Sequence, residues 1–296
     1  MTTKQRKIGQ FTVSAIGLGA MPLSSAEPTP SRDQAIATVH AALDAGVTLI
    51  DTADIYAPSW DTMGHNEAIV AAALESYPGD TSKIVVATKG GITRSEGENW
   101  GRNASPEYLR RAVDRSRQRL GVDTIDLYYW HRPDRRRLYA EVVETFAHLK
   151  AEGIIREVGI SNANVEEIEV AIEVLGEGGL AAVQNEFSPR FHHTSAKELR
   201  YCGRRGVAFL PWSPLGGMGG GAAAVGERFP VLSEVADAHG VSAQQVTLAW
   251  ELSLGEHVIP IPGASRRESI IDSAKAMSLD LTPEELQRIT AALLQR

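Results

Sequence analysis

Short apolar runs alternate with longer amphipathic runs along the whole sequence, and this alternation restricts the possible folds more than any other feature. The short runs are apolar on both faces, as at 84–86, which is typical of strands in a parallel sheet covered by helices. Ser31 is a fitting N-cap for the first long run, Gly121 a fitting stop for a later one, and Thr282 with Glu285 predicts a capping box for the last helix. The expected strands are 14–19, 47–50, 83–88, 125–130, 154–160, 181–185, 207–212 and 258–261, and the expected helices before the last one are 32–45, 67–76, 106–120, 138–152, 165–175, 195–204, 231–239, 242–254 and 266–276.

Eight such strand–helix repeats follow one another without a linker or a shift in composition. This organisation predicts a single α/β domain over 1–296, a closed (β/α)8 or TIM barrel, with an open doubly wound sheet as the alternative. Residues 4–13, with a possible turn at Gly9 and Gln10, predict a β-hairpin that covers the N-terminal mouth of the barrel. The glycine-rich stretch 216–221 predicts a mobile loop after the seventh strand.

The charge balance and the apolar runs restrict the partners and the location of the protein. Asp and Glu outnumber Lys and Arg by 37 to 30, whereas nucleic-acid-binding proteins usually show the opposite balance, so the arginines at 110–119 and 135–137 are interpreted as solvated helix faces. No apolar run is long enough to cross a membrane, and the basic N-terminus is followed by polar residues where a signal peptide would be apolar. The single cysteine, Cys202, excludes an internal disulfide. We therefore expect a cytoplasmic protein with no nucleic-acid or membrane partner and no evident obligate protein partner.

Ionisable side chains follow three successive predicted strands. Asp51 comes directly after 47–50, Lys89 after 83–88 and His131 after 125–130, and Tyr56 follows five residues after Asp51. Because active sites of (β/α)8 barrels lie at the C-terminal ends of the strands, we expect these four side chains on one rim. Each of them alone has a structural explanation, such as a turn cap or a hydrogen-bonded histidine. A buried carboxylate or ammonium is costly unless paired, however, and Asp51 and Lys89 lie on neighbouring strands where they could pair.

These four side chains suit the reduction of a carbonyl group. Addition of a hydride leaves an alkoxide that needs a proton, and a tyrosine hydroxyl can donate it, although its ordinary pKa is about 10. A nearby ammonium lowers that pKa, a carboxylate holds the ammonium in place, and a histidine can orient the substrate oxygen. This chemistry needs no metal, and no metal site is expected, because the adjacent His192 and His193 point apart and lack further ligands at zinc-binding spacing.

Over its whole length the sequence resembles the aldo-keto reductase family. The resemblance rests on motifs in a fixed order: Gly17-Leu18-Gly19, Asp51-Thr52-Ala53-Asp54-x-Tyr56, Thr88-Lys89, Asp126-Leu127-Tyr128-x-x-His131, Gly159-Ile160-Ser161-Asn162, Gln184-Asn185-x-Phe187-Ser188, Trp212-Ser213-Pro214-Leu215-Gly216-Gly217 and Ile261-Pro262-Gly263-Ala264-Ser265-Arg266. It implies an enzyme that reversibly reduces an aldehyde or ketone with NADPH, yielding the alcohol and NADP+. It also implies a catalytic tetrad, in which Tyr56 donates the proton, Lys89 and Asp51 tune it, and His131 positions the carbonyl.

The same resemblance implies a cofactor site on the rim of the barrel. Ser161, Asn162 and Gln184 match positions that hold the nicotinamide carboxamide, 213–217 matches the segment around the pyrophosphate, and Ser265 with Arg266 matches the part that meets the 2′-phosphate. The full set of expected cofactor-binding residues is Gly19, Met21, Asp51, Ser161, Asn162, Gln184, Trp212, Ser213, Pro214, Leu215, Gly217, Ile261, Gly263, Ser265, Arg266 and Asp272.

The sequence departs from the family pattern in three segments. The loop after Tyr56 is longer than usual and has Asn66 where a serine is common. The stretch 269–273 lacks the usual arginine, which weakens the expected grip on the phosphate, although Asp272 could receive the adenine amino group. The glycine loop after the seventh strand lacks the common Leu-Thr-Gly-Lys run.

Two other functions are alternatives to a reductase. A non-catalytic binding or regulatory subunit is disfavoured by the complete tetrad, and a metal-dependent barrel hydrolase by the lack of a histidine pair at a strand end. Candidates for the substrate pocket are Met21, Trp60, Trp100, Trp130 and Trp212, which suggest a bulky or planar carbonyl compound, although aromatic side chains near strand ends also fill cores. The loop around Trp60 and the segment 90–104 are expected to vary the chemistry on a fixed scaffold.

Overall fold

Seven parallel strands form the central sheet of the computed structural model, which describes residues 4–217 and 220–294. Their order in the sheet follows their order in the chain, so each strand pairs with the strand of the preceding and of the following repeat. The strands are β3 (Leu18–Gly19), β4 (Leu49–Asp51), β5 (Val85–Gly90), β8 (Ile125–Trp130), β9 (Ile155–Ser161), β10 (Leu180–Glu186) and β11 (Ala208–Trp212).

The segment 257–263 closes the sheet into a barrel. On one side the backbone N–H of Phe209 in β11 donates to the carbonyl of His257 at 2.7 Å, and on the other the N–H of Gly19 in β3 donates to Pro262 at 3.0 Å. Pro260 and Pro262 have no N–H to return to β3, which is the reason that the expected eighth strand makes isolated bridges instead of a regular ladder. Hydrogen bonds on both sides of this segment favour the barrel over the open-sheet alternative.

The predicted N-terminal hairpin is present and plugs one end of the barrel. It consists of β1 (Gln5–Ile8) and β2 (Phe11–Ser14), joined by the expected turn, where Gly9 adopts a φ of 51°. Ile8 and Val13 are buried and pack with apolar side chains from the barrel strands. The N–H of Gln10 donates to the buried carboxylate of Glu157 in β9 at 2.9 Å, which fastens the plug to the barrel.

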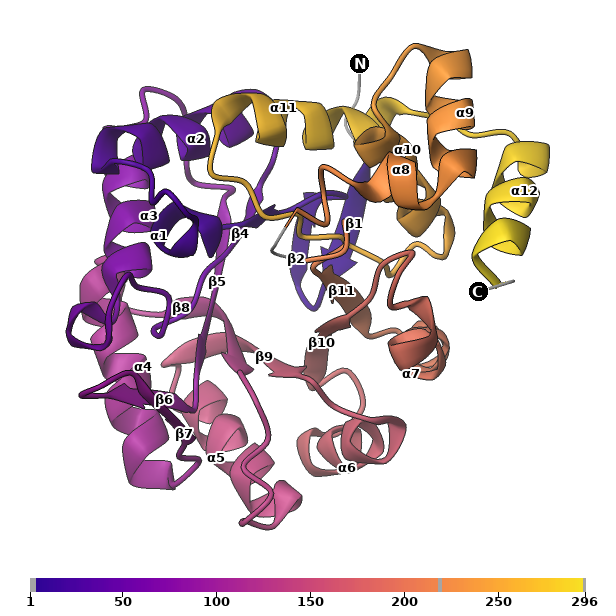
Figure 1. Ribbon diagram of the computed structural model, residues 1–296. Helices are drawn as coiled ribbons and strands as arrows, with labels where there is room; N and C mark the ends of the chain where they lie inside the picture. Colours follow the sequence, from indigo (N-terminus) through magenta and orange to yellow (C-terminus); the bar gives the residue numbers. More distant parts are fainter. Residues whose placement is uncertain (1–3, 218–219, 295–296) are drawn as a thin grey trace.

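Helices surround the barrel, as Figure 1 shows. The predicted caps are in place: Ser31 and Gln34 form a capping box, and Thr282 and Glu285 exchange side-chain-to-backbone bonds of 3.2 and 2.8 Å. In the described residues no helix is both long and apolar enough to cross a bilayer. The long helices are α2 (Arg32–Asp44), α3 (His65–Ser76), α4 (Pro106–Leu120), α5 (Tyr139–Ala151), α6 (Val165–Leu175), α7 (His192–Arg205), α9 (Pro230–His239), α10 (Ala243–Ser253), α11 (Arg267–Lys275) and α12 (Pro283–Leu294), with short turns at α1 (Pro22–Ser25), η1 (Trp60–Thr62), α8 (Val225–Arg228) and η2 (Ala276–Ser278).

A second hairpin, which the sequence did not predict, stands between β5 and α4. It consists of β6 (Ile92–Ser95) and β7 (Asn99–Arg102), and its tight turn places Gly97 and Glu98 at φ of 73° and 59°. Arg94 donates to the carbonyls of Ala57 at 2.8 Å and Pro58 at 3.2 Å, which holds the hairpin against the loop after β4. The segment expected to vary the chemistry is therefore an ordered flap.

Candidate active site

The four predicted side chains converge at the C-terminal ends of β4, β5 and β8. Lys89 is fully buried, and its Nζ donates to a carboxylate oxygen of Asp51, to the carbonyl of Thr52 at 2.8 Å and to the hydroxyl of Tyr56 at 3.3 Å. Asp51 and Lys89 thus form the ion pair expected from neighbouring strands. The second carboxylate oxygen of Asp51 accepts from Nε2 of Gln184 at 2.7 Å, so β10 also supports the pair.

His131 lies beside Tyr56 and is held by its backbone. The two rings meet edge to face, with 5.8 Å between their centroids. The N–H of His131 donates to Gly90 at 3.0 Å, and its carbonyl accepts from Nδ2 of Asn162 at 3.1 Å. The neighbouring strands therefore fix where the imidazole stands relative to the tyrosine hydroxyl.

Burial sets the protonation of this cluster more strongly than the sequence suggested. Burial raises the pKa of Tyr56, and the Lys89 ammonium opposes this without reversing it. The expected lowering by Lys89 has the right sign, but it is smaller than the cost of desolvating a phenolate. The hydroxyl of Tyr56 is consequently protonated at neutral pH, which is the form that a proton donor needs.

The neighbours of Tyr56 keep complementary protonation states. Burial favours the neutral amine of Lys89, but Asp51 and Tyr56 outweigh it and the pKa of Lys89 is raised. Burial, together with the charges of Lys89 and Arg132, holds the pKa of His131 well below its usual value. The cluster therefore contains three groups in defined protonation states: the charged ammonium of Lys89, the neutral imidazole of His131 and the protonated phenol of Tyr56.

The residues that are expected to bind the nicotinamide lie at the C-terminal ends of β9 and β10. Asn162 adopts a left-handed backbone with φ of 59° directly after β9, and its Nδ2 also contacts Oγ of Ser161 at 2.9 Å. Oγ of Ser161 in turn donates to the carbonyl of Gln184 at 2.7 Å. The structure thus brings Ser161, Asn162 and Gln184 together next to Asp51 and His131, although the amide of Gln184 already donates to Asp51.

The residues expected around the pyrophosphate follow β11 in an unusual backbone conformation. Ser213, Gly216 and Gly217 all have positive φ, at 54°, 94° and 83°. Pro214 and Leu215 between them are buried, whereas Trp212 at the end of β11 is half-buried. The loop predicted over 216–221 continues through 218–219, which lie outside the described residues.

Close packing of the barrel explains two of the expected glycines. A Cβ on Gly19 would lie 2.7 Å from the carbonyl oxygen of Ile261, and one on Gly263 would lie 2.8 Å from the ring of Pro22. These glycines are needed where β3 approaches the closing segment. Met21 is half-buried immediately before α1.

The residues expected at the adenosine end lie at and after the start of α11. Arg266 precedes the helix and is exposed, with its Nη2 3.5 Å from Oγ of Ser269. Ser265 is half-buried next to it. The carboxylate of Asp272, which is expected to receive the adenine amino group, already accepts from Oγ of Ser242 at 2.6 Å and from Nε2 of Gln245 at 2.5 Å, both on or next to α10.

The candidate pocket tryptophans divide into two groups. Trp130 is buried and its ring lies 4.7 Å from that of Tyr139, so it fills the core between β8 and α5. Trp60 and Trp100 are 38% and 60% exposed on η1 and β7 and are accessible to a ligand. Trp212 is half-buried at the end of β11.

Asn66 has a role that the sequence did not reveal. It is buried in the first turn of α3 and accepts from the hydroxyl of Thr52 at 2.6 Å. Its Nδ2 donates to the carbonyl of Ala20 and to Oγ of Ser24, both at 2.8 Å. Asn66 therefore ties together the ends of β3 and β4.

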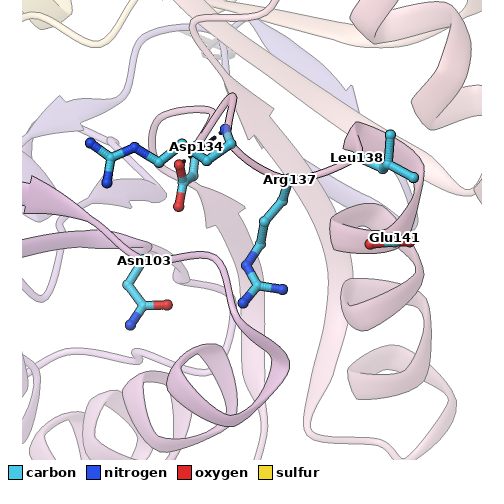
Figure 2. A pocket seen from close by; sticks show the side chains of 6 residues that line it. Asn103, Asp134, Arg137, Leu138 and Glu141 are labelled. Carbon is cyan, nitrogen blue, oxygen red and sulfur yellow. Dashed lines mark hydrogen bonds between the residues drawn. The ribbon is translucent and has the colours of Figure 1, made fainter.

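A cavity of about 440 Å³ lies outside the tetrad, between the starts of α4 and α5 (Figure 2). Its lining mixes both signs of charge and includes no residue of the tetrad: Asn103, Asp134, Arg136, Arg137, Leu138 and Glu141. It flanks the loop after β8 without being part of the cluster around Tyr56.

Known proteins match this chain in sequence and in structure. The model of the Aldo/keto reductase family matches residues 15–294. The 6-dehydroglucose reductase of Novosphingobium aromaticivorans is 34% identical over 282 residues, which cover 93% of this chain and 90% of that protein. The glycerol dehydrogenase of Gluconobacter oxydans has a TM-score of 0.83 at 26% identity, covering 100% of this chain and 96% of that one. An aldo-keto reductase of Klebsiella pneumoniae, solved in complex with NADPH, has a TM-score of 0.80 at 28% identity, covering 98% and 95%.

Proposed function

The chain belongs to the aldo/keto reductase family, and on that basis we propose that it reduces a small-molecule aldehyde or ketone to the alcohol with NADPH, in a reversible reaction. The observation that carries this proposal is the cluster of a protonated Tyr56, a buried Lys89–Asp51 ion pair and a neutral His131 on one barrel rim. When bound, NADPH supplies the hydride.

Tyr56 is the proton donor in this proposal. Its hydroxyl is protonated at neutral pH and lies 3.3 Å from Nζ of Lys89. As the proton moves to the substrate oxygen, the ammonium of Lys89 stabilises the phenolate that remains. Asp51 keeps that ammonium charged and in place, because the bond from Gln184 fixes the carboxylate.

His131 orients the carbonyl. A neutral imidazole can donate one N–H to the substrate oxygen without competing with Tyr56 as an acid. The hydrogen bonds from His131 to Gly90 and from Asn162 to His131 hold its backbone, so a substrate oxygen near the imidazole would also lie near the Tyr56 hydroxyl.

The remaining predicted residues fit a dinucleotide phosphate. Arg266 and Arg267 are exposed at the N-terminus of α11, where a cationic fork and free backbone N–H groups suit a phosphate. The positive φ angles of Ser213 and Gly217 allow the backbone to approach a ligand closely. Ser161 and Asn162 offer polar atoms beside His131 for the nicotinamide end.

Purified protein incubated with NADPH and a panel of aldehydes and ketones tests the proposal. We expect oxidation of NADPH that depends on the carbonyl compound, followed by absorbance and by detection of the alcohol. A non-catalytic binding subunit would instead bind NADPH, as measured by fluorescence, without oxidising it with any compound of the panel.

A further inference from the structure

Arg132 occupies a rigid position at the mouth of the barrel, directly after His131. The carbonyl before it, on His131, accepts from Asn162 at 3.1 Å, and the carbonyl after it, on Pro133, accepts from Nη1 of Arg102 at 3.0 Å. The proline that follows also restricts the backbone of Arg132 to extended conformations. The loop after β8 and the β6–β7 hairpin thus present the Arg132 side chain from a fixed backbone.

The guanidinium of Arg132 has no partner within residues 4–217 and 220–294. Its side chain is half-buried, yet it forms no hydrogen bond and no ion pair with any of these residues. Arg135 on the same loop differs, since it is exposed and pairs with Glu167 at 3.3 Å. A partly desolvated charge without an ion pair is costly, so a negatively charged ligand at this position would stabilise it.

The backbone of Arg132 lies just beyond the end of β8, directly after His131 of the tetrad. β8 lies in the middle of the sheet, with β4 two strands away on one side and β10 two strands away on the other. Burial raises the pKa of Tyr56, on the loop after β4, and that of Glu186, at the end of β10, and the charge of Arg132 opposes both shifts. Both effects agree with the place of Arg132 at the end of β8, between β4 and β10 in the sheet.

The electrostatic surroundings leave room for an anion. Arg132 and Arg190 both act on Glu186, and neither forms an ion pair with it in the described part of the chain. A guanidinium that forms no ion pair with a carboxylate of the described residues attracts negatively charged ligands.

We propose that Arg132 binds a carboxylate group of the substrate, so that the preferred substrates are aldehydes or ketones that also carry a carboxylate. This inference rests on the proposed reductase function. The planar guanidinium presents two parallel N–H donors, which match the two oxygens of a carboxylate. A substrate held at one end by Arg132 and at its carbonyl by His131 would be aligned for proton transfer from Tyr56.

Two aldehydes that differ only in charge test this assignment. 4-Carboxybenzaldehyde and methyl 4-formylbenzoate share one ring and one carbonyl, and the ratio of their kcat/KM values measures the preference for the acid. We expect the parent protein to favour the acid and Arg132→Gln to lower the acid-to-ester ratio by about 10- to 100-fold, through KM more than kcat. Arg132→Lys should recover part of the preference, because it keeps the charge and loses the fork.

Arg136→Gln is the matched control, since Arg136 is exposed on the same loop. It should leave the acid-to-ester ratio at the parent value. Quenching of tryptophan fluorescence by 4-(hydroxymethyl)benzoate gives a second readout, and its binding to the NADP+-loaded protein should weaken in Arg132→Gln to the same extent as the ratio.

The outcomes separate the two proposals. If acid and ester are both reduced with a ratio that Arg132→Gln does not change, the carboxylate assignment is overturned and the reductase function stands. If neither aldehyde nor any other carbonyl compound is reduced although NADPH binds, both proposals are overturned.

Discussion

The two sides of the barrel rim are built in different ways. At the ends of β4, β5 and β8 the polar side chains are buried and bonded to one another, and Lys89 alone donates to three oxygens. After β11 and before α11 the predicted residues are more exposed, and Ser269 at 3.5 Å is the only hydrogen-bond partner of the Arg266 guanidinium among the described residues. The first side is fixed by its own contacts, whereas the second offers charge and backbone geometry that stay accessible. On the proposed function, chemistry belongs to the first side and cofactor binding to the second.

Tyr56→Phe should have the largest effect on activity, and it should separate the two sides of the rim by abolishing most carbonyl reduction while NADPH binding persists. The change removes only the hydroxyl, so the ring still packs beside His131 and NADPH binding should persist. Carbonyl reduction should fall by about 10²–10⁴-fold, as for the loss of a general acid. Single-turnover NADPH oxidation with a reactive aldehyde, beside a fluorescence titration of the cofactor, measures both. Reduction at the parent rate with intact NADPH binding would mean that the tetrad is assigned wrongly.

Lys89→Met should lower stability as well as activity, because the buried catalytic side of the rim depends on the ion pair between Lys89 and Asp51. Among the residues that the structure describes, the change leaves the buried Asp51 carboxylate with only the amide of Gln184 as a partner. Loss of one member of a buried pair costs about 3–5 kcal/mol in the free energy of unfolding, measured by denaturant titration. The double variant Asp51→Asn/Lys89→Met removes the stranded charge and should recover part of the loss. Parent-like stability of the single variant would contradict this account.

Arg266→Ala should affect cofactor choice and leave the catalytic side intact. Its guanidinium is exposed at the N-terminus of α11, so we expect affinity for NADPH to fall by about tenfold and affinity for NADH to change little. Lys275→Ala, at the other end of the same helix, is the control and should change neither affinity. Equal affinity of the parent protein for the two cofactors would show that this end of the site does not read the 2′-phosphate.

The pH dependence of reduction should be the smallest effect. Burial and the charges of Lys89 and Arg132 hold the pKa of His131 well below 6.5, so lowering the pH through 6.5 does not protonate it. Burial also keeps Tyr56 protonated as the pH rises to 8. We expect kcat/KM for reduction to vary by less than about twofold between about pH 6 and 8. An inflection near pH 6.5 that disappears in His131→Asn would show that the histidine titrates at its ordinary value.

Local sequence patterns predicted the elements and the approximate place of the catalytic cluster. The expected 106–120, 125–130 and 165–175 agree end for end with α4, β8 and α6. These elements carry clear boundaries, such as the Ser105 cap that accepts from Tyr108 at 3.3 Å. Apolar periodicity, caps and breakers act over a few residues, so they can be seen without knowing the fold.

Long-range hydrogen bonds were decided by the tertiary structure. The bond from Gln184 to Asp51 joins residues 133 positions apart and exists because the barrel brings β10 opposite β4. The engagement of Asp272 by Ser242 and Gln245 likewise depends on how α10 and α11 pack. No local pattern distinguishes a side chain that stays available for a ligand from one that the protein itself occupies.

The electrostatics of the site also belong to the fold as a whole. The sequence by itself determined that an ammonium would stand near Tyr56, and it gave the sign of that influence. Only the tertiary structure decided that burial outweighs it and keeps the phenol protonated. It also decided that Trp130 fills the core and that the side chain of Arg132, between the bonded carbonyls of His131 and Pro133, forms no hydrogen bond or ion pair among the described residues. Desolvation and pairing depend on every group that surrounds a side chain, and most of these groups come from distant parts of the chain.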